Sequence, residues 1–198
     1  MENNFNLKNL KPDIRTLKDM GTVLYDKKWQ KTADPEMELY YMYRGLKQKD
    51  NFRYDITVVF PKMLGKEFNK TKGHRHNNDY GEIYIVLEGE AIYLMQKENN
   101  GIIEDVYVVK AEKGDVCIIP PYYSHFTINP GQTELKMANW LDKNCQSDYK
   151  GIQQKQGACY FYTTNDWIKN PNYTSIPSLR FEQPKKSLPQ KFLHTVAK

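Results

Sequence analysis

Three of the four histidines in the chain lie where strands are expected to begin or end, together with one glutamate. His74 and His76 are two residues apart, Glu82 opens an apolar segment, and His125 follows a proline-rich turn. Side chains two apart on an extended strand point to the same side, so the imidazoles of His74 and His76 can meet at one point. A carboxylate at the start of a buried strand needs a partner, because burying an unpaired charge is costly. Together the four residues predict a metal site.

The types of these ligands restrict the metal. Three imidazoles and one carboxylate would complete the tetrahedral shell of zinc and leave no position for a substrate. An ion that prefers six ligands would keep two positions open for neighbouring substrate oxygens. We therefore expect one divalent ion per chain, either Fe²⁺, Mn²⁺, Ni²⁺ or Co²⁺, with Zn²⁺ as an alternative.

The segments that must position these residues are short, rich in aromatic and β-branched side chains, and separated by turn residues. Such segments are typical of strands, and their spacing, with no helix-length segment between them, predicts a sandwich or barrel. Asn100-Gly101 predicts a hairpin, and the sequence EGE at 88–90 predicts a second tight turn. Two hairpins in this region would let the strand with His125 fold back beside the strand with Glu82.

The length of 198 residues suits a single domain, whose core is expected to span about 38–162. Residues 1–37 are expected to form a leader. Within it, the sequence PDIRTLKDM predicts a short helix with Asp13 near its start and Gly21 after its end. A C-terminal extension over 163–198 is rich in Pro, Asn and Ser and predicts an irregular tail.

Charge and composition exclude several classes of protein. The formal charge of +5 is spread along the chain without a dense basic cluster, so we expect no nucleic-acid partner, whereas anionic small substrates would be favoured. Cys117, Cys145 and Cys159 form no CxxC pair. No segment approaches the roughly 20 apolar residues of a membrane-spanning helix, and the N-terminus has no signal-peptide pattern. We expect a cytoplasmic protein with no membrane partner, and a solvent-exposed His194.

Two longer motifs contain the expected metal ligands. The segment GHRHNNDYGEIYIVLEGE fits the first cupin motif, with Glu82 and Gly89 at its closing spacing. The segment GDVCIIPPYYSHFTIN fits the second motif through four residues: Gly114, Pro120, His125 and Asn129. Glu82 follows His76 by six residues, whereas in most cupins the glutamate follows by four or five.

This longer spacing, together with the preceding GKEFNKTKGH, resembles a narrower group, the cupin-type glucose-6-phosphate isomerases best known from archaea. The resemblance is strongest over residues 54–131 and extends over 38–162. It implies an all-β cupin fold (a double-stranded β-helix or jelly-roll barrel). It also implies an enzyme of glycolysis and gluconeogenesis that interconverts glucose 6-phosphate and fructose 6-phosphate. An open sheet edge favours pairing, and the aromatic segment ELYYMYR predicts a homodimer through N-terminal strands.

The resemblance also assigns roles to particular residues. His74, His76, Glu82 and His125 would hold the metal. Glu82 would also carry the proton between C1 and C2; a metal-assisted hydride shift would need no base, and the sequence leaves both routes open. Tyr149, in the segment SDYKGI, matches an aromatic hydroxyl near the site.

A phosphate pocket is expected next to the metal. Four residues match the phosphate pocket of the family: Tyr40, Thr57, Thr71 and Gly73. The ammonium group of Lys72, which lies between two of them in the sequence TKGH, could reach the same phosphate.

Two departures from the family leave the substrate open. Ser147 stands where the family commonly has a histidine, and Trp140 and Leu141 occupy the region of a family tyrosine. These positions affect ring opening and the choice of sugar but not the metal site. The alternatives are an isomerase of another free or phosphorylated sugar, a non-catalytic metal-containing sugar-binding cupin, and a dioxygenase.

Overall fold

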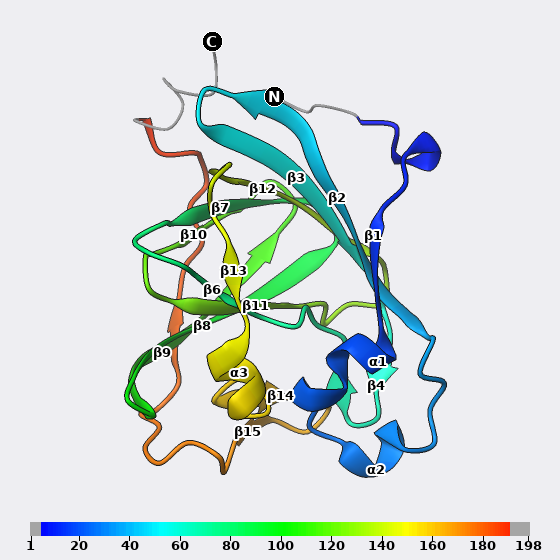
Figure 1. Cartoon of the computed structure of the whole chain (residues 1–198), viewed down its shortest axis with the longest axis vertical. Helices are drawn as coiled ribbons and strands as arrows, with labels where there is room; N and C mark the ends of the chain where they lie inside the picture. Colours follow the sequence, from blue (N-terminus) through cyan, green and yellow to red (C-terminus); the bar gives the residue numbers. More distant parts are fainter. Residues whose placement is uncertain (1–4, 191–198) are drawn as a thin grey trace.

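Two β-sheets form the body of the protein and pack around an apolar core (Figure 1). The computed structural model describes residues 5–190. The six-stranded sheet has the order β1 (Asp13–Thr16), β2 (Glu38–Lys49), β3 (Phe52–Val59), β12 (Leu135–Asp142), β7 (Glu82–Glu88) and β10 (Val116–Ile119). The four-stranded sheet has the order β11 (Ser124–Ile128), β8 (Glu90–Asn99), β9 (Ile102–Glu112) and β16 (Arg180–Glu182). The predicted all-β cupin fold is confirmed.

The remaining elements are short. Three two-stranded ladders pair β4 (Met63–Leu64) with β5 (Glu67–Phe68), β6 (Arg75–His76) with β13 (Ser147–Asp148), and β14 (Tyr160–Tyr162) with β15 (Trp167–Lys169). The helical segments are η1 (Leu7–Asn9), α1 (Leu17–Met20), η2 (Gly21–Val23), α2 (Lys27–Gln30) and α3 (Lys150–Gln154). Within residues 5–190, no helix is long and apolar enough to cross a membrane. The residues of the candidate site lie on strands and on the loops between them.

The apolar core draws side chains from both sheets and from the N-terminal segment. Tyr93 and Phe126, from the four-stranded sheet, are fully buried there. Leu17 and Met20 lie in the same cluster, although they precede the expected core of 38–162. Full burial of a side chain of this size contributes about 1.5–3 kcal/mol, so the segment before residue 38 is packed into the folded body.

The two predicted turns are present, and their backbone explains the residues that form them. Gly89 links β7 to β8 at φ +79°, and a Cβ at this position would lie 2.7 Å from the carbonyl oxygen of Glu134. Asn100 and Gly101 link β8 to β9 with φ values of +51° and +83°. Positive φ at both central residues is the requirement of a tight hairpin turn, and Asn-Gly meets it with little strain.

The helix predicted over PDIRTLKDM is wrong in its first half. Asp13–Thr16 is the edge strand β1, in which Asp13 lies opposite Met42 of β2. The helix α1 starts only at Leu17, where Thr16 and Asp19 form a capping box. The open edge of β2 offers backbone partners to the residues before this cap, and those long-range hydrogen bonds outweigh the local helical pattern.

The tail predicted as irregular also contains ordered strands. Trp167–Lys169 pairs with β14, and Arg180–Glu182 adds a parallel strand to β9, seen at the left of Figure 1. Arg180 binds Asp105 through Nε at 3.1 Å and Nη2 at 2.7 Å. The unpaired edge of β9 and this bidentate ion pair explain the ordering. His194, expected to be exposed, lies outside the described residues.

The position of the strand with His125 also differs from the expectation. The strands beside β7 are β12 and β10, and Ile119 of β10 lies opposite Glu82. The chain then crosses to the other sheet, where His125 pairs with Met95 of β8 and forms an isolated bridge with His74. His125 therefore reaches Glu82 from across the barrel and not from a neighbouring strand.

Candidate active site and metal centre

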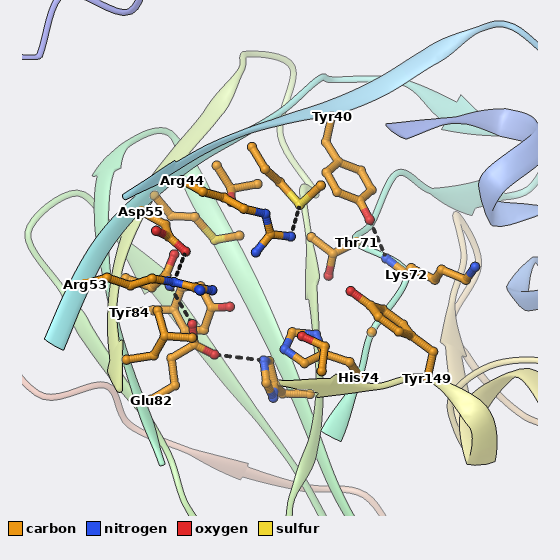
Figure 2. Close-up of a pocket in the computed structure, with 18 residues that line it drawn as sticks. Tyr40, Arg44, Arg53, Asp55, Thr71, Lys72, His74, Glu82, Tyr84 and Tyr149 are labelled. Carbon is orange, nitrogen blue, oxygen red and sulfur yellow. Dashed lines mark hydrogen bonds and ion pairs between the residues drawn. The ribbon is translucent and has the colours of Figure 1, made fainter. Parts of the chain in front are cut away.

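A pocket opens on the inner face of the six-stranded sheet, and its lining follows the two-residue period of the strands (Figure 2). The strands contribute Tyr40, Met42 and Arg44 (β2), Arg53, Asp55 and Thr57 (β3), Glu82 and Tyr84 (β7), and Met137, Asn139 and Leu141 (β12). The other wall consists of Thr71, Lys72, Gly73, His74, His125, Ser147 and Tyr149. All the site residues expected from the sequence line this pocket except His76, which lies beside it in the ligand cluster described next.

Four ligand side chains converge on one point at the base of the pocket. One donor atom from each of His74, His76, Glu82 and His125 lies within 4.8 Å of the others. The Nε2 atoms of His74 and His76 are 3.2 Å apart. Glu82 Oε2 lies 3.2 Å from His76 Nε2 and 3.1 Å from His125 Nε2. The expected ligand set is thus assembled by the fold.

The buried atoms of this cluster fit a cation better than they fit one another. Among residues 5–190, Glu82 Oε2 and both ring nitrogens of His125 have no hydrogen-bond partner of acceptable geometry, although Glu82 and His125 are both buried. A buried polar atom without a partner costs about 1–3 kcal/mol. A divalent ion at the shared point would accept lone pairs from Glu82 Oε2 and His125 Nε2, so the residues present fit a metal.

Two contacts orient the ligands. Asn139 Nδ2 donates to Glu82 Oε1 at 2.6 Å, which turns Oε2 toward the histidines. Nδ1 of His76 lies 3.3 Å from the carbonyl oxygen of Tyr80, so a proton on Nδ1 leaves the Nε2 lone pair free. Outer contacts of this kind orient metal ligands in proteins. Tyr80 thus contributes through its backbone oxygen.

The pKa shifts in the cluster follow from burial and neighbouring charge. Burial opposes ionisation of Glu82, but the imidazoles of His125 and His76 outweigh it and hold the carboxyl pKa well below its usual value. Burial and the nearby His125 lower the pKa of His74. Burial also opposes a charge on His76, yet the neighbouring Cys145 and the Glu82 carboxylate raise its pKa to about 10. Glu82 is thus anionic and His74 neutral at pH 7, the forms that bind a cation, whereas His76 must release a proton.

The loop from Thr71 to Gly73 forms the other end of the pocket. The Tyr40 hydroxyl accepts a hydrogen bond from the Lys72 backbone N–H at 3.2 Å. Burial raises the pKa of Tyr40 to about 12, so this hydroxyl keeps a proton that it can donate. Gly73 has φ +75°, and a Cβ there would lie 2.1 Å from the Phe126 ring. A residue other than glycine would therefore displace the loop.

Tyr149 connects the two ends of the pocket. Its ring centroid lies 5.7 Å from the Lys72 ammonium and 5.6 Å from the His74 ring centroid. The ladder between β13 and β6 holds it there, because Ser147 lies opposite His76 and Asp148 opposite Arg75. The aromatic hydroxyl expected near the site is accordingly on the wall of the pocket (Figure 2).

Sequence reasoning missed several polar residues of the pocket: Arg44, Arg53, Asp55, Tyr84 and Asn139. A signal for four of them was available, because they lie two or four residues from positions that were named. Arg44 follows Tyr40 by four, Asp55 and Arg53 precede Thr57 by two and four, and Tyr84 follows Glu82 by two. On a strand these spacings place side chains on one face. Asn139 lies two residues before Leu141, but Leu141 was named only as a departure from the family and not as a pocket residue, so it gave no signal for Asn139.

The model of the family described as glucose-6-phosphate isomerase (GPI) matches residues 14–178. The chain belongs to the glucose-6-phosphate isomerase family. A glucose-6-phosphate isomerase from Pyrococcus abyssi is 28% identical over 170 residues, which cover 82% of this chain and 88% of the relative. The enzyme of the same name from Pyrococcus horikoshii is 30% identical over 147 residues, covering 72% of this chain and 76% of the relative. The resemblance to cupin-type glucose-6-phosphate isomerases is confirmed.

Solved structures include an oxalate decarboxylase from Lactobacillus farciminis in complex with formate. It superposes with a TM-score of 0.46 at 17% sequence identity, over 59% of this chain and 33% of that chain.

Proposed function

We propose that the protein is a metal-dependent aldose–ketose isomerase that interconverts glucose 6-phosphate and fructose 6-phosphate. One observation carries the proposal: the unpartnered ligand atoms of Glu82 and His125 share a pocket with the loop Thr71–Gly73, in a chain that belongs to the isomerase family. Such a pocket suits a ligand with a phosphate at one end and reacting oxygens at the other. An isomerase of another sugar would use the same residues, and substrate comparison separates the two.

The phosphate end is formed by hydroxyl, ammonium and backbone groups. Thr71, Lys72 and Gly73 provide one side of the phosphate site, and Tyr40 and Thr57 provide the other. The Thr71 hydroxyl accepts a hydrogen bond from the Thr127 N–H at 3.0 Å, so its own proton is free to point into the pocket. Donors aimed at an anion from several directions fix its position as well as its affinity. The sugar chain then extends toward the ligand cluster.

His74, His76, Glu82 and His125 would hold one divalent ion, which when bound would supply Lewis-acid stabilisation of negative charge on the oxygens at C1 and C2. We propose Fe²⁺, Mn²⁺, Ni²⁺ or Co²⁺, because these ions accept more than four ligands, with Zn²⁺ as the alternative. The contacts of the two Glu82 carboxylate oxygens bear on its proposed role as proton carrier. Asn139 occupies Oε1 and the histidines surround Oε2, so both oxygens are held in place.

The route of the hydrogen between C1 and C2 is proposed in two forms. Glu82 would carry it as a proton, if one carboxylate oxygen leaves its partners during turnover, or the hydrogen would move directly as a hydride. Tyr149 lies between Lys72 and His74 and would donate to a sugar oxygen during ring opening. Exchange of substrate hydrogen with deuterium from the solvent separates the two routes, since a direct hydride shift exchanges none.

We also propose that the protein acts as a homodimer in the cytoplasm. The outer face of the six-stranded sheet carries a second apolar cluster: Tyr54, Ile56, Val58, Ala138 and Trp140. Partly buried Phe52, Phe60 and Leu87 extend it. The five cluster residues are already buried within the chain, so the apolar surface that a second copy could cover is that of the partly buried Phe52, Phe60 and Leu87, whose burial would be favourable. A solution mass near 23.4 kDa by light scattering would contradict the dimer.

The test is isomerisation of fructose 6-phosphate, coupled to oxidation of glucose 6-phosphate. Protein stripped by a chelator is reloaded separately with Mn²⁺, Fe²⁺, Ni²⁺, Co²⁺ or Zn²⁺, beside a His125→Ala variant. Activity that returns with metal and is absent from the variant supports the proposal. Metal bound at one ion per chain, without activity toward this sugar or other phosphorylated and free sugars, would favour a non-catalytic cupin.

A further inference from the structure

The side of the pocket away from the Thr71–Gly73 loop carries two arginines that the roles above do not use. Arg44 of β2 and Arg53 of β3 both line the pocket, and Figure 2 shows them together with Asp55, facing the side that holds Lys72. Arg53 precedes Thr57 by four residues on the same face of β3. At about 3.3 Å per residue, the two positions are about 13 Å apart along the strand. The pocket therefore has cations at both ends.

Asp55 fixes the position of both arginines. It is 4% exposed, its Oδ2 accepts a hydrogen bond from Arg53 Nε at 3.1 Å, and its Oδ1 accepts one from the Gly45 N–H at 2.7 Å. Gly45 follows Arg44 within the register shift of β2 and has φ +67°. One buried carboxylate thus holds the guanidinium of Arg53 directly and sets the backbone next to Arg44.

The side chain of Arg44 has an acidic partner, Asp13. Its Nε donates to Asp13 Oδ2 at 3.0 Å, and its Nη2 lies 3.3 Å from Met42 Sδ. Asp13 is solvent-exposed, so water screens this pair and its strength is small. The contact steers the side chain of Arg44 without removing its charge from the pocket.

Both arginines lie close to the ligand cluster. Arg53 is opposite Leu141 of β12, which in turn is opposite Glu82 of β7. With neighbouring strands about 4.8 Å apart, the backbones of Arg53 and Glu82 are about 10 Å apart, a distance that an arginine side chain can largely span. Arg44 lines the same pocket as His74 and Glu82. The guanidinium groups are thus within electrostatic reach of the reacting end.

The reaction proposed for this end of the pocket would be favoured by cationic hydrogen-bond donors such as guanidinium groups. In the proposed isomerisation, negative charge develops on the neighbouring oxygens of C1 and C2 once the phosphate is held at the other end. A guanidinium offers parallel N–H donors to two adjacent oxygens and keeps its charge at any working pH. Donors that are already in place stabilise developing charge without reorganisation. The Asp55 bond uses Nε of Arg53, and the terminal Nη groups are not needed for it.

We propose that Arg53, assisted by Arg44, contacts the C1–C2 oxygens of the open-chain sugar and stabilises the negative charge that develops on them, and that Asp55 is the positioning residue of both. The inference rests on the proposed isomerase function and deepens it, because it assigns recognition of the reacting end to residues outside the ligand cluster. It also makes the pocket selective for phosphorylated ligands with a second anionic group at the far end of the chain.

Two probes test this selectivity. One is a five-carbon aldonic acid phosphorylated at its terminal carbon, whose carboxylate occupies the place of the C1–C2 oxygens. The other is the phosphorylated alditol of the same length, which keeps the phosphate and lacks the carboxylate. Their dissociation constants are measured by calorimetry on metal-loaded wild type, Arg53→Met, Arg53→Lys and Arg44→Met, each with its metal content determined. Lys97→Met removes a surface cation and serves as the matched control.

Arg53→Met is expected to weaken aldonate binding roughly 10- to 100-fold, the range for a lost hydrogen bond to a charged group, and alditol binding less than about 3-fold. Arg44→Met should weaken aldonate binding in the same way but by less. Arg53→Lys should weaken it by an intermediate amount, since lysine keeps the charge and loses the parallel N–H donors. Lys97→Met should change neither probe. Equal losses of both probes in Arg53→Met would reveal a merely structural role, and unchanged binding of both would show no contact; either result overturns the inference.

Asp55→Asn tests the positioning role. It keeps an acceptor for Gly45 and loses the ion pair with Arg53, so aldonate binding should weaken about as much as in Arg53→Met while alditol binding holds. Unchanged aldonate binding together with a large loss of turnover would make Asp55 a proton-transfer group and overturn this role. If wild type isomerises fructose 6-phosphate and Arg53→Met turns over equally fast, only the inference fails. If wild type does not isomerise, the proposed function fails.

Discussion

Two groups of buried charged side chains lie close together in the sequence, and their atoms are satisfied in different ways. Glu67 and Lys70 form an ion pair with side chains that are 1% and 4% exposed. Glu67 also accepts a hydrogen bond from the Tyr25 N–H at 2.9 Å, and the Lys70 ammonium lies 4.8 Å from the Phe161 ring centroid. This pair is complete within the protein.

Three members of the ligand cluster, His76, Glu82 and His125, are buried to the same degree, and the cluster is incomplete. Glu82 Oε2 and His125 Nε2 lie 3.1 Å apart and form no hydrogen bond with each other or with another group of residues 5–190. Burial therefore does not distinguish a structural charge from a functional one, whereas the presence or absence of partners does. The Glu67–Lys70 pair ties the N-terminal segment and β14 to the loop that begins at Thr71, and the ligand cluster offers its free lone pairs to a cation.

Among the variants that test this comparison, removal of one metal ligand should have the largest effect on activity. His125→Ala is expected to lose the metal and to lower kcat/KM on the order of 10³-fold or more, because several kcal/mol of charge stabilisation disappear. The metal-free variant should melt a few degrees below metal-free wild type, since the deleted ring nitrogens have no partner within residues 5–190 and the loss is that of the small cavity left by the ring. Metal analysis, coupled kinetics and melting curves check this. A melting temperature that falls by more than 10 °C would mean that His125 is a structural residue.

Breaking the Glu67–Lys70 ion pair should have the opposite result, a loss of stability with little change in activity. Lys70→Met leaves the Glu67 carboxylate buried and unpaired, so the free energy of unfolding should fall by about 3–5 kcal/mol while kcat per folded molecule changes little. Denaturant titration measures the first quantity and active-site titration the second. Lys97→Met, which removes an exposed partner of Glu104, should cost less than about 1 kcal/mol.

A double variant tests whether the loss of stability comes from the unpaired buried charge. Replacing both partners, as Glu67→Leu with Lys70→Met, removes both charges and should recover much of the lost stability. No recovery would show that the hydrogen bond from Tyr25 to Glu67, and not the ion pair, holds this region together.

Metal binding should stabilise the intact protein by a smaller amount. At a free metal concentration of 100 times Kd, linkage predicts about 2.7 kcal/mol. Thermal melting of chelator-treated wild type with and without Mn²⁺ measures it, and the same addition to His125→Ala should shift the melting temperature by less than 1 °C. An equal shift in both proteins would locate the stabilising ion elsewhere.

The smallest expected effect concerns the phosphate end. Lys72→Met should raise KM for fructose 6-phosphate about 10-fold and leave kcat nearly unchanged, because the phosphate interaction is the same in the ground state and the transition state. Steady-state kinetics separate the two constants. A fall in kcat with constant KM would move Lys72 from substrate binding to the reaction itself.

The histidine pair, the glutamate and the turns could be predicted because their signals are local. Alternation on a strand places His74 and His76 together, and Asn100-Gly101 encodes its own backbone turn, so neither needs knowledge of distant residues. Tyr40, Thr57, Thr71 and Gly73 were reached through the resemblance to the isomerase family. The structure brings all of them into one pocket.

Only the tertiary structure decided what depends on distant partners. Asp13–Thr16 became a strand because β2 had a free edge, and Arg180–Glu182 joined β9 for the same reason. The arginine end of the pocket appears only when Asp55 meets Gly45 across two strands. Local sequence specifies which way a side chain points along its own element. Which elements become neighbours is settled by the free backbone edges and apolar surfaces that the folded chain leaves to be covered.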